Sequence, residues 1–291
     1  MSTRTATLVG SGALALWSLL ALFTAASGAV PPFQLAAMTF ATGGALGAAS
    51  WLFRPTAICA LRQPLRVWAL GVGGLFGYHA LYFAALRLAP PAEAGLINYL
   101  WPLLIVLFST LLPGERLRAA HVAGALLGFM GLVALAAGRG GVNFDPSAAP
   151  GYLCAFVAAF VWSGYSVLSR RFGTVPTDAV AGFCGATAFL SLAAHLAFER
   201  TVWPATAGQW SAVVALGLGP VGLAFYLWDI GVKRGDIRLL GVASYATPVL
   251  STLILVLSGY AEPTLSLGVA CALIAAGALV ATWPGKRPVA A

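Results

Sequence analysis

Long apolar segments fill most of this chain, and short breaks containing proline, glycine or charged residues separate them. An α-helix needs about 20 apolar residues to cross the hydrocarbon core of a bilayer. On this criterion the pattern predicts ten membrane-spanning helices, at residues 6–27, 33–53, 66–88, 91–112, 117–138, 150–171, 178–198, 209–232, 236–259 and 263–283. Only one break, GRGGVNFDPSAAP near the centre, is long enough to be a linker.

Composition agrees with a membrane location. Of the 291 residues, 60% are hydrophobic and only 8% are charged, against about 25% charged in soluble domains. So few charges cannot cover a water-exposed surface, and we expect an all-α integral membrane protein surrounded by membrane lipid. The net charge is +8. Because the basic residues lie in the breaks between apolar segments, they indicate topology and not a nucleic-acid partner.

The distribution of lysine and arginine predicts the orientation. Ten spans place both termini on one side of the membrane. Thirteen of the sixteen Lys and Arg residues would lie on that side: Arg4, Arg54, Arg62, Arg66, Arg116, Arg118, Arg170, Arg171, Lys233, Arg234, Arg238, Lys286 and Arg287. Arg87, Arg139 and Arg200 would lie on the other side. Since cytoplasmic loops are enriched in these residues, we expect both termini to be cytoplasmic.

The second half of the chain repeats features of the first, at an offset that drifts from about 145 to about 147 residues. Trp17 recurs as Trp162, and each is followed by serine. Further matches pair Arg87, Gly95, Tyr99 and Pro102 with Lys233, Gly241, Tyr245 and Pro248. We therefore expect two repeats, at residues 1–140 and 148–284. Each holds five predicted spans, an odd number, so the second would be inverted relative to the first around a central cavity.

Short motifs accompany this architecture: LWS in the first span, YLWPLL in the fourth, YATPVL in the ninth, and a glutamate that opens the fifth and the tenth. Together they resemble the drug/metabolite transporter superfamily over essentially the whole chain. Within it the chain is similar to the EamA-type exporters, and most similar to the bacterial members that export aromatic amino acids. The resemblance implies the inner membrane, efflux, and a central cavity lined mainly by spans 1, 3, 4, 6, 8 and 9.

Aromatic and small polar residues lie near the middle of several spans. In the third span, Tyr78, His79 and Tyr82 share one side of a helix. Gly73 and Gly77 form a GxxxG pair on roughly the other side, where a neighbouring helix should approach closely. We predict a substrate cavity lined by Trp17, Tyr78, His79, Tyr82, Asn98, Tyr99, Trp101, Trp162, Ser244, Tyr245 and Ser251.

Two features of these spans each admit two interpretations. A polar group at the centre of a bilayer faces a cavity or a partner, so His79 either lines the cavity or makes a hydrogen bond between helices. Pro102 and Pro248 occupy equivalent mid-span positions, where each removes a backbone hydrogen bond. They therefore predict either hinges or static kinks.

Several classes of function are disfavoured. Asp229 is the only acid well inside a span, and its spacing from Lys233 predicts a local ion pair. Because no Lys or Arg lies mid-span, we do not expect a phosphate-bearing substrate. The sequence has no HExxH or GxSxG motif, no carboxylate pair and no CxxC pair among its four cysteines. We expect no catalytic residues, no metal and no cofactor, and hence not an enzyme.

An uncharged cavity with aromatic walls and a few polar groups suits a zwitterion with a large side chain. We predict a transporter that exports aromatic and other hydrophobic amino acids by alternating access. An efflux transporter for cationic or apolar drugs and metabolites is the alternative, because aromatic rings also attract cations. A passive channel is a third possibility. The sequence leaves the coupling ion open, and it is compatible with a monomer.

Overall fold

The computed structural model describes residues 1–113, 118–138, 140–141, 143–259 and 262–282. Four basic residues used above to assign orientation, Arg116, Arg139, Lys286 and Arg287, lie outside the described residues. Every regular element within the described ranges is a helix. The predicted all-α class is therefore confirmed for this part of the chain.

Nine helical segments of the described chain are long and apolar enough to cross a membrane. Four are undivided over most of their length: α8 (Ala119–Ala137), α9 (Ala149–Arg171, preceded by η4, Pro146–Ala148), α10 (Ala179–Phe198) and α15 (Leu265–Thr282). Five are divided into α1 (Thr3–Ser18) and α2 (Leu20–Ala26); α4 (Leu65–Val72), η2 (Gly73–Gly77) and α5 (Tyr78–Leu88); α6 (Pro91–Asn98), α7 (Trp101–Phe108) and η3 (Ser109–Leu111); α11 (Ala207–Leu218), η5 (Gly219–Leu223) and α12 (Ala224–Arg234); and α13 (Ile237–Ala243) and α14 (Ala246–Leu257). They correspond to nine of the ten predicted spans.

The remaining predicted span, 33–53, coincides with α3 (Pro32–Ser50), a helix of 19 residues that is followed by η1 (Pro55–Leu61). This helix is not among the nine, because polar and small residues lower its hydropathy. Gln34, Thr39, Gly43 and Gly44 are all buried, so they face other helices of the protein. Ten crossings therefore stay a prediction.

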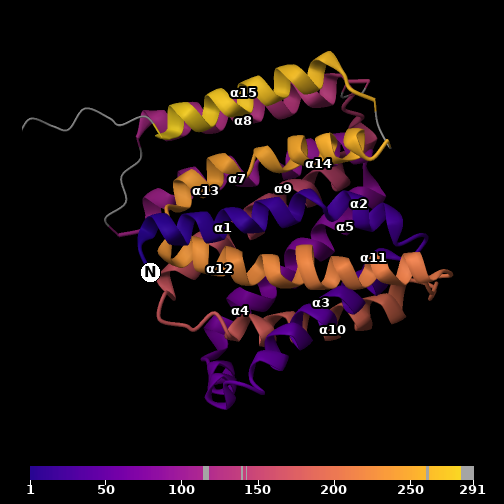
Figure 1. Ribbon diagram of the computed structural model, residues 1–291. Coiled ribbons are helices and arrows are strands. Elements are labelled where there is room, and N and C mark those ends of the chain that lie inside the picture. Colours follow the sequence, from indigo (N-terminus) through magenta and orange to yellow (C-terminus); the bar gives the residue numbers. More distant parts are fainter. Residues whose placement is uncertain (114–117, 139, 142, 260–261, 283–291) are drawn as a thin grey trace, which may run out of the picture.

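The helices lie side by side with their axes roughly parallel (Figure 1). At one edge α8 packs against α15, and at the other α3 packs against α10. Between these edges, α1 packs against α12 and α5 against α9. Each of the four pairs joins a helix of the first half to a helix of the second, so the two halves form one intertwined bundle.

Irregular backbone recurs at equivalent places in the two halves. The wide helical turn η2 begins at Gly73, and η5 begins 146 residues later at Gly219. A break at Tyr99 separates α6 from α7, and a break at Tyr245, again 146 residues later, separates α13 from α14. Irregular backbone at membrane depth is tolerated where it is buried in protein or lines a cavity. We therefore expect these four places to be buried in the bundle or to line a cavity within it.

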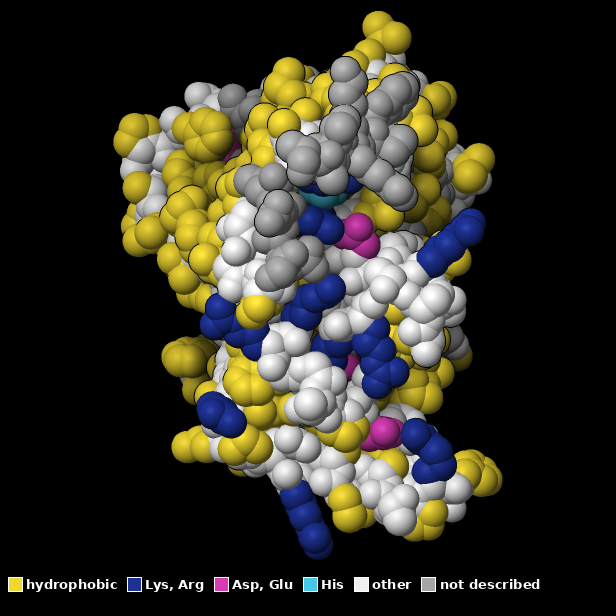
Figure 2. Space-filling model, turned by 90° about the vertical axis from the view of Figure 1, so that its left-hand side faces the viewer, with side chains coloured by type: hydrophobic (Ala, Val, Ile, Leu, Met, Phe, Trp, Pro, Cys, Tyr) yellow, Lys and Arg dark blue, Asp and Glu magenta, His cyan; other side chains and the backbone are white. Residues whose placement is uncertain are grey.

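The two ends of the bundle can be told apart by their contacts. The start of α1 lies beside the end of α12, because the N–H of Asp236 donates to Thr7 Oγ1 over 2.8 Å. The end of α9 lies there too, since Arg170 donates to the carbonyl of Gly235 over 2.6 Å. We call this the N-terminal end and the opposite one the far end. Figure 2 looks onto the N-terminal end and shows Lys and Arg side chains spread across it.

The sides of the bundle are apolar. Large hydrophobic side chains are exposed along the helices, among them Leu153, Phe189, Leu196 and Leu279. In water such a surface would drive aggregation, whereas in a bilayer it matches the surrounding acyl chains. The pattern of exposure therefore agrees with a multi-pass membrane protein.

Glycines allow the closest helix contacts. A Cβ atom added at Gly43 would lie 2.9 Å from the Cα of Gly222, and one added at Gly124 would lie 2.5 Å from the carbonyl oxygen of Gly277. The predicted close approach at Gly73 and Gly77 is wrong, because nothing lies within 4 Å of a Cβ at Gly73 and only Val161, at 3.8 Å, meets one at Gly77. These two glycines belong to η2, whose wide turn changes the side of the span that each residue faces.

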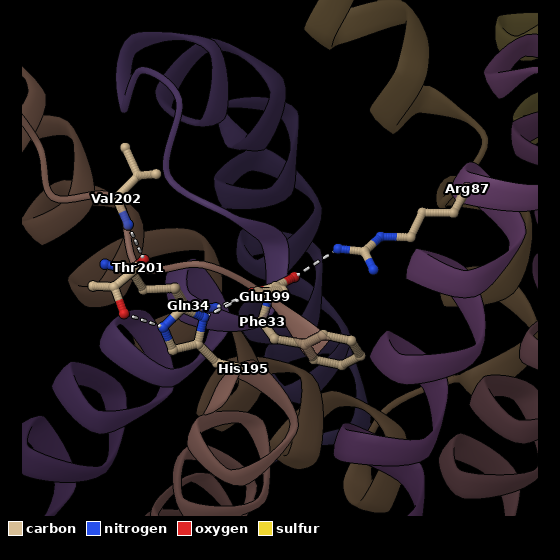
Figure 3. Close-up of polar contacts among 7 residues, drawn as sticks. All are labelled: Phe33, Gln34, Arg87, His195, Glu199, Thr201 and Val202. Carbon is tan, nitrogen blue, oxygen red and sulfur yellow. Dashed lines mark hydrogen bonds and ion pairs between the residues drawn. The ribbon is translucent and has the colours of Figure 1, made fainter. Parts of the chain in front are cut away.

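A buried carboxylate fixes the start of α3 at the far end (Figure 3). Glu199, whose side chain is 1% exposed, accepts hydrogen bonds from the backbone N–H groups of Phe33 and Gln34 over 3.1 Å. His195 Nδ1 lies 3.0 Å from Glu199, and Arg87 donates to the same carboxylate of Glu199 over 3.1 Å. One side chain thus joins the first turn of α3, the end of α10 and the end of α5.

The glycine contacts give a test of the α8–α15 interface. Gly124→Ala should lower the free energy of unfolding by about 1–3 kcal/mol, because the new methyl group overpacks against the backbone of Gly277. The measurement is the thermal unfolding midpoint of the purified protein in detergent.

Gly268→Ala is the matched control, since it lies on α15 and nothing is within 4 Å of its added Cβ. It should leave the midpoint unchanged or raise it, because alanine favours helix. Equal effects of the two substitutions would contradict the close packing of α8 on α15.

Candidate functional site

A chamber of about 170 Å³ lies inside the bundle, between helices of both halves. Its lining residues are Trp17, Leu20, Tyr78, His79, Tyr82, Asn98, Tyr99, Trp101, Trp162, Pro220, Val221, Phe225 and Thr247. We call this the central chamber. Apolar and aromatic walls with a few polar groups are typical of small-molecule binding sites.

The central chamber continues into a larger space of about 350 Å³, which we call the vestibule. The two share Trp17, Leu20, Tyr82, Tyr99 and Thr247 as lining residues. The vestibule is also lined by Pro91 and Ala92 at the start of α6 and by Ala136 at the end of α8. These elements place it toward the far end of the bundle.

Toward the N-terminal end the space is closed. The rings of Trp17, Trp101 and Trp162 meet the fully buried Trp228, with centroid distances of 5.1, 6.0 and 6.2 Å. Beyond Trp228, a cavity of only about 10 Å³ lies beside Asp229, which is room for one water molecule at most. The tryptophans therefore form a floor beneath the central chamber.

The floor is held together by ring packing and two indole hydrogen bonds. Trp228 Nε1 donates to Ser166 Oγ over 3.1 Å. Trp17 Nε1 donates over 3.0 Å to the carbonyl of Pro220, which belongs to the irregular turn η5. Each close ring pair adds about 0.5–1.5 kcal/mol beyond its buried area. The irregular backbone thus supplies the acceptor that positions Trp17.

Few polar atoms face the chamber, and its lining in the described chain includes no Asp, Glu, Lys or Arg. His79 Nδ1 lies 2.7 Å from the carbonyl oxygen of Leu75 in its own helix. Asn98 Nδ2 donates to the hydroxyl of Tyr78 over 3.0 Å. The stacked rings of Tyr78 and Tyr82 have centroids 6.0 Å apart. The site can bind a neutral or zwitterionic solute, and it offers no charged partner to an ion.

The structure brings together eight of the eleven residues predicted to bind substrate. The chamber is lined by Trp17, Tyr78, His79, Tyr82, Asn98, Tyr99, Trp101 and Trp162. Ser251 lines the vestibule. The other two lie elsewhere: the hydroxyl of Ser244 donates to the carbonyl of Leu240, and Tyr245 is fully buried against Phe129.

The two prolines lie just after helix breaks and not within continuous helices. Pro102 is the second residue of α7, and Pro248 is the third residue of α14. In the first turn of a helix the missing N–H of proline costs no hydrogen bond. Pro248 also lines the vestibule. The predicted mid-span kinks are therefore breaks between two short helices.

Sequence inspection missed Phe225, Thr247 and Trp228, and the repeat offset contains the signal that finds them. Phe225 lies 146 residues after His79, and Thr247 lies 146 residues after Trp101. Trp228 stands at the same offset from Tyr82. The same offset also carries Asn98 and Tyr99 onto Ser244 and Tyr245, which do not line the chamber, so it identifies only some of the lining residues of the second half.

Charged groups lie outside the chamber. The predicted pair of Asp229 and Lys233 is confirmed, with Nζ 2.8 Å from Oδ1. Within the described residues no three His, Cys, Asp or Glu side chains gather in a way that could hold a metal ion. The geometry therefore describes an internal chamber without acidic or basic lining residues that continues into the vestibule toward the far end.

Comparison with known proteins places this geometry in a family. The model of the EamA-like transporter family matches residues 4–137 and again residues 149–283. "Aromatic amino acid exporter YddG" of Ancylobacter novellus is 62% identical over 288 residues, covering 99% of this chain and 100% of that protein. The protein of the same name in Salmonella typhimurium is 29% identical, covering 87% of this chain and 88% of that one. A crystal structure at 63% identity superposes with a TM-score of 0.94 and covers 97% of each chain. The chain belongs to the EamA-like transporter family.

Proposed function

We propose that this protein exports aromatic and other hydrophobic amino acids across the bacterial inner membrane by alternating access. The observation that carries the proposal is the uncharged, ring-lined chamber that opens toward one end of the bundle and is closed at the other. The relative with 62% identity is named an aromatic amino acid exporter, as are those of Salmonella typhimurium and Escherichia coli.

The chamber chemistry supports an amino acid as substrate. Trp101 and Trp162 offer ring faces and edges to an apolar or aromatic side chain. The hydroxyl, amide and imidazole groups can meet both charges of a zwitterion. A cationic drug would find no carboxylate among the lining residues, only ring faces and neutral acceptors, to balance its charge, so it fits less well.

The orientation follows from charge. Lys and Arg side chains are spread across the N-terminal end of the bundle (Figure 2), and such residues are retained on the cytoplasmic side. Both termini would then be cytoplasmic. The vestibule would face the outside, and the structure would represent an outward-open conformation.

Two inverted five-helix repeats, at residues 1–140 and 148–284, would provide the moving parts. The family model matches the chain twice, and the irregular turns recur 146 residues apart. The start of α1 and the end of α9, the equivalent helix of the second half, meet at the N-terminal end. These helices therefore run in opposite directions, as inversion requires.

Lys233 and Arg87 occupy equivalent positions in the two repeats, and their surroundings support a transition in which the closed end opens and the open end closes. Lys233, at the closed N-terminal end, lies 2.8 Å from Asp229, and the two side chains are 5% and 2% exposed. Lys233 also donates to the carbonyl of Val175 over 3.0 Å, and Thr177 donates to Asp229 over 2.7 Å. Together these contacts, which we call the inner latch, tie α12 to the segment between α9 and α10.

Arg87 is the equivalent residue of the first repeat, at the open far end. It lies 3.1 Å from Glu199, and its side chain is 50% exposed while that of Glu199 is 1% exposed. Under alternating access the two ends trade roles. Arg87 would become buried as the far end closes, and the inner latch would become hydrated as the N-terminal end opens.

Trp101→Ala and His79→Ala should each lower the counterflow of labelled tryptophan in proteoliposomes about tenfold. Each substitution removes a group from the chamber wall, and a tenfold change corresponds to about 1.4 kcal/mol of lost interaction. Trp210→Ala is the control, because Trp210 is 42% exposed and stacks on Trp203 away from the chamber. Full flux in both chamber variants would show that the chamber is not part of the transport path.

The same vesicles test the substrate class. The wild-type protein should exchange tryptophan and, more slowly, threonine, and it should not move ethidium. Movement of ethidium without tryptophan would replace the proposal by efflux of cationic drugs. Flux that does not saturate and shows no countertransport would indicate a channel.

Lys233→Met should open the N-terminal end. It leaves the carboxylate of Asp229 buried without its cation, which disfavours the closed arrangement by about 3–5 kcal/mol. The measurement uses a protein without its four native cysteines, which are free in the described structure, and with Ser169→Cys beside the inner latch. Labelling by an impermeant thiol reagent from the cytoplasmic side should rise severalfold.

Arg87→Gln is the matched control for the other end. Glu199 keeps its hydrogen bonds from the N–H groups of Phe33 and Gln34 and its contact with His195. The inner latch is also untouched, so labelling at position 169 should stay near the wild-type level. Adding Asp229→Asn to Lys233→Met removes both buried charges and should return labelling toward that level. Unchanged labelling in Lys233→Met alone would contradict the inner latch.

A further inference from the structure

The polar atoms of the central chamber differ in whether they accept or donate. His79 Nδ1 lies 2.7 Å from the carbonyl oxygen of Leu75. Because a carbonyl oxygen only accepts, the ring proton sits on Nδ1, and the neutral ring presents Nε2 as an acceptor. Within the described chain Nε2 makes no hydrogen bond.

Asn98 provides a second acceptor. Its Nδ2 donates to the hydroxyl of Tyr78 over 3.0 Å, which leaves the amide oxygen Oδ1 as the free end of the side chain. Asn98 is 2% exposed, and Oδ1 finds no donor among the described residues. A buried oxygen without a donor is rare in proteins and requires an explanation. In the wall of a binding site, a ligand can supply the missing donor.

Tyr78, whose hydroxyl accepts from Asn98, lies beside the two acceptors, but three other hydroxyl-bearing residues occupy a different part of the chamber. Thr247 on α14 is 7% exposed, and its Oγ1 has no partner in the part of the chain that the structure describes. Thr247, Tyr82 and Tyr99 line both the chamber and the vestibule, whereas His79 and Asn98 line the chamber alone. Thr247, Tyr82 and Tyr99 therefore lie nearer the open end, and the two acceptors lie deeper.

We infer that the chamber binds a zwitterionic amino acid in one orientation. Its ammonium group is bound by His79 Nε2 and Asn98 Oδ1, and its carboxylate is bound by the hydroxyls of Thr247, Tyr82 and Tyr99. An ammonium group only donates and a carboxylate only accepts, whereas a hydroxyl does both. In the opposite orientation the carboxylate would face the two acceptors His79 Nε2 and Asn98 Oδ1, neither of which can donate to it. The inference rests on the proposed amino-acid transport and adds which groups recognise each end of the substrate.

Competition between substrate analogues tests this assignment. Unlabelled tryptophan, tryptamine (which lacks the carboxylate) and indole-3-propionate (which lacks the ammonium group) compete with labelled tryptophan in proteoliposomes. Thr247→Val, close in shape, should weaken competition by tryptophan and indole-3-propionate about tenfold and leave tryptamine unchanged. Asn98→Leu should weaken competition by tryptophan and by tryptamine about tenfold and leave competition by indole-3-propionate unchanged. The analogue that keeps its affinity shows in each case that the variant is folded.

Thr39→Val is the control, because Thr39 is buried outside the chamber and its hydroxyl donates to the carbonyl of Leu35 over 2.7 Å. It should leave all three competitors unchanged. If Thr247→Val and Asn98→Leu weaken the three competitors equally, or not at all, while the wild-type protein exchanges tryptophan, the assignment of the two ends is wrong and the proposed function stands. If the wild-type protein does not exchange tryptophan, both fail.

Discussion

The hydrocarbon core of a membrane offers no hydrogen bonds, and this constraint determines where the protein can depart from regular helix. Each backbone group and each polar side chain at that depth needs a partner inside the protein. In this structure the wide turns at Gly73 and Gly219 and the breaks at Tyr99 and Tyr245 lie in the spans that surround the chamber or its floor. The Pro220 carbonyl accepts from Trp17, so the exception to regular helix helps to build the site.

The chamber and the two ends of the bundle use different interactions. Around the central chamber the lining consists of aromatic rings and neutral polar atoms without fixed charge, which suits the zwitterionic substrate that we propose. At the N-terminal end, ring packing around Trp228 and the buried pair of Asp229 and Lys233 close the path. At the far end Arg87 remains half exposed. The chamber is thus closed toward the N-terminal end and continues into the vestibule toward the far end, and the proposed alternating access would reverse this asymmetry.

Much of the helix arrangement and of the chamber lining could be predicted from the sequence, because the length of apolar segments and the spacing of the repeats can be read directly from the order of residues. The spans and the eight chamber residues fall in this class. Tyr245 and the Gly73–Gly77 pair could not be placed, because a helix break and a wide turn rotate the residues that follow. Hydropathy likewise gives α3 too low a value to be identified as a span, because its polar residues face other helices and not lipid. The partners across the chamber, such as Phe225, become visible only when the repeat offset is applied.

A crystal structure with 5-bromotryptophan would test the central claim most directly, because the bromine gives an anomalous signal that locates the ligand without ambiguity. The account predicts one strong peak among Trp17, Trp101 and Trp162, inside the central chamber. A peak on the outer, lipid-facing surface of the bundle, or no peak in the chamber at saturating ligand, would contradict it.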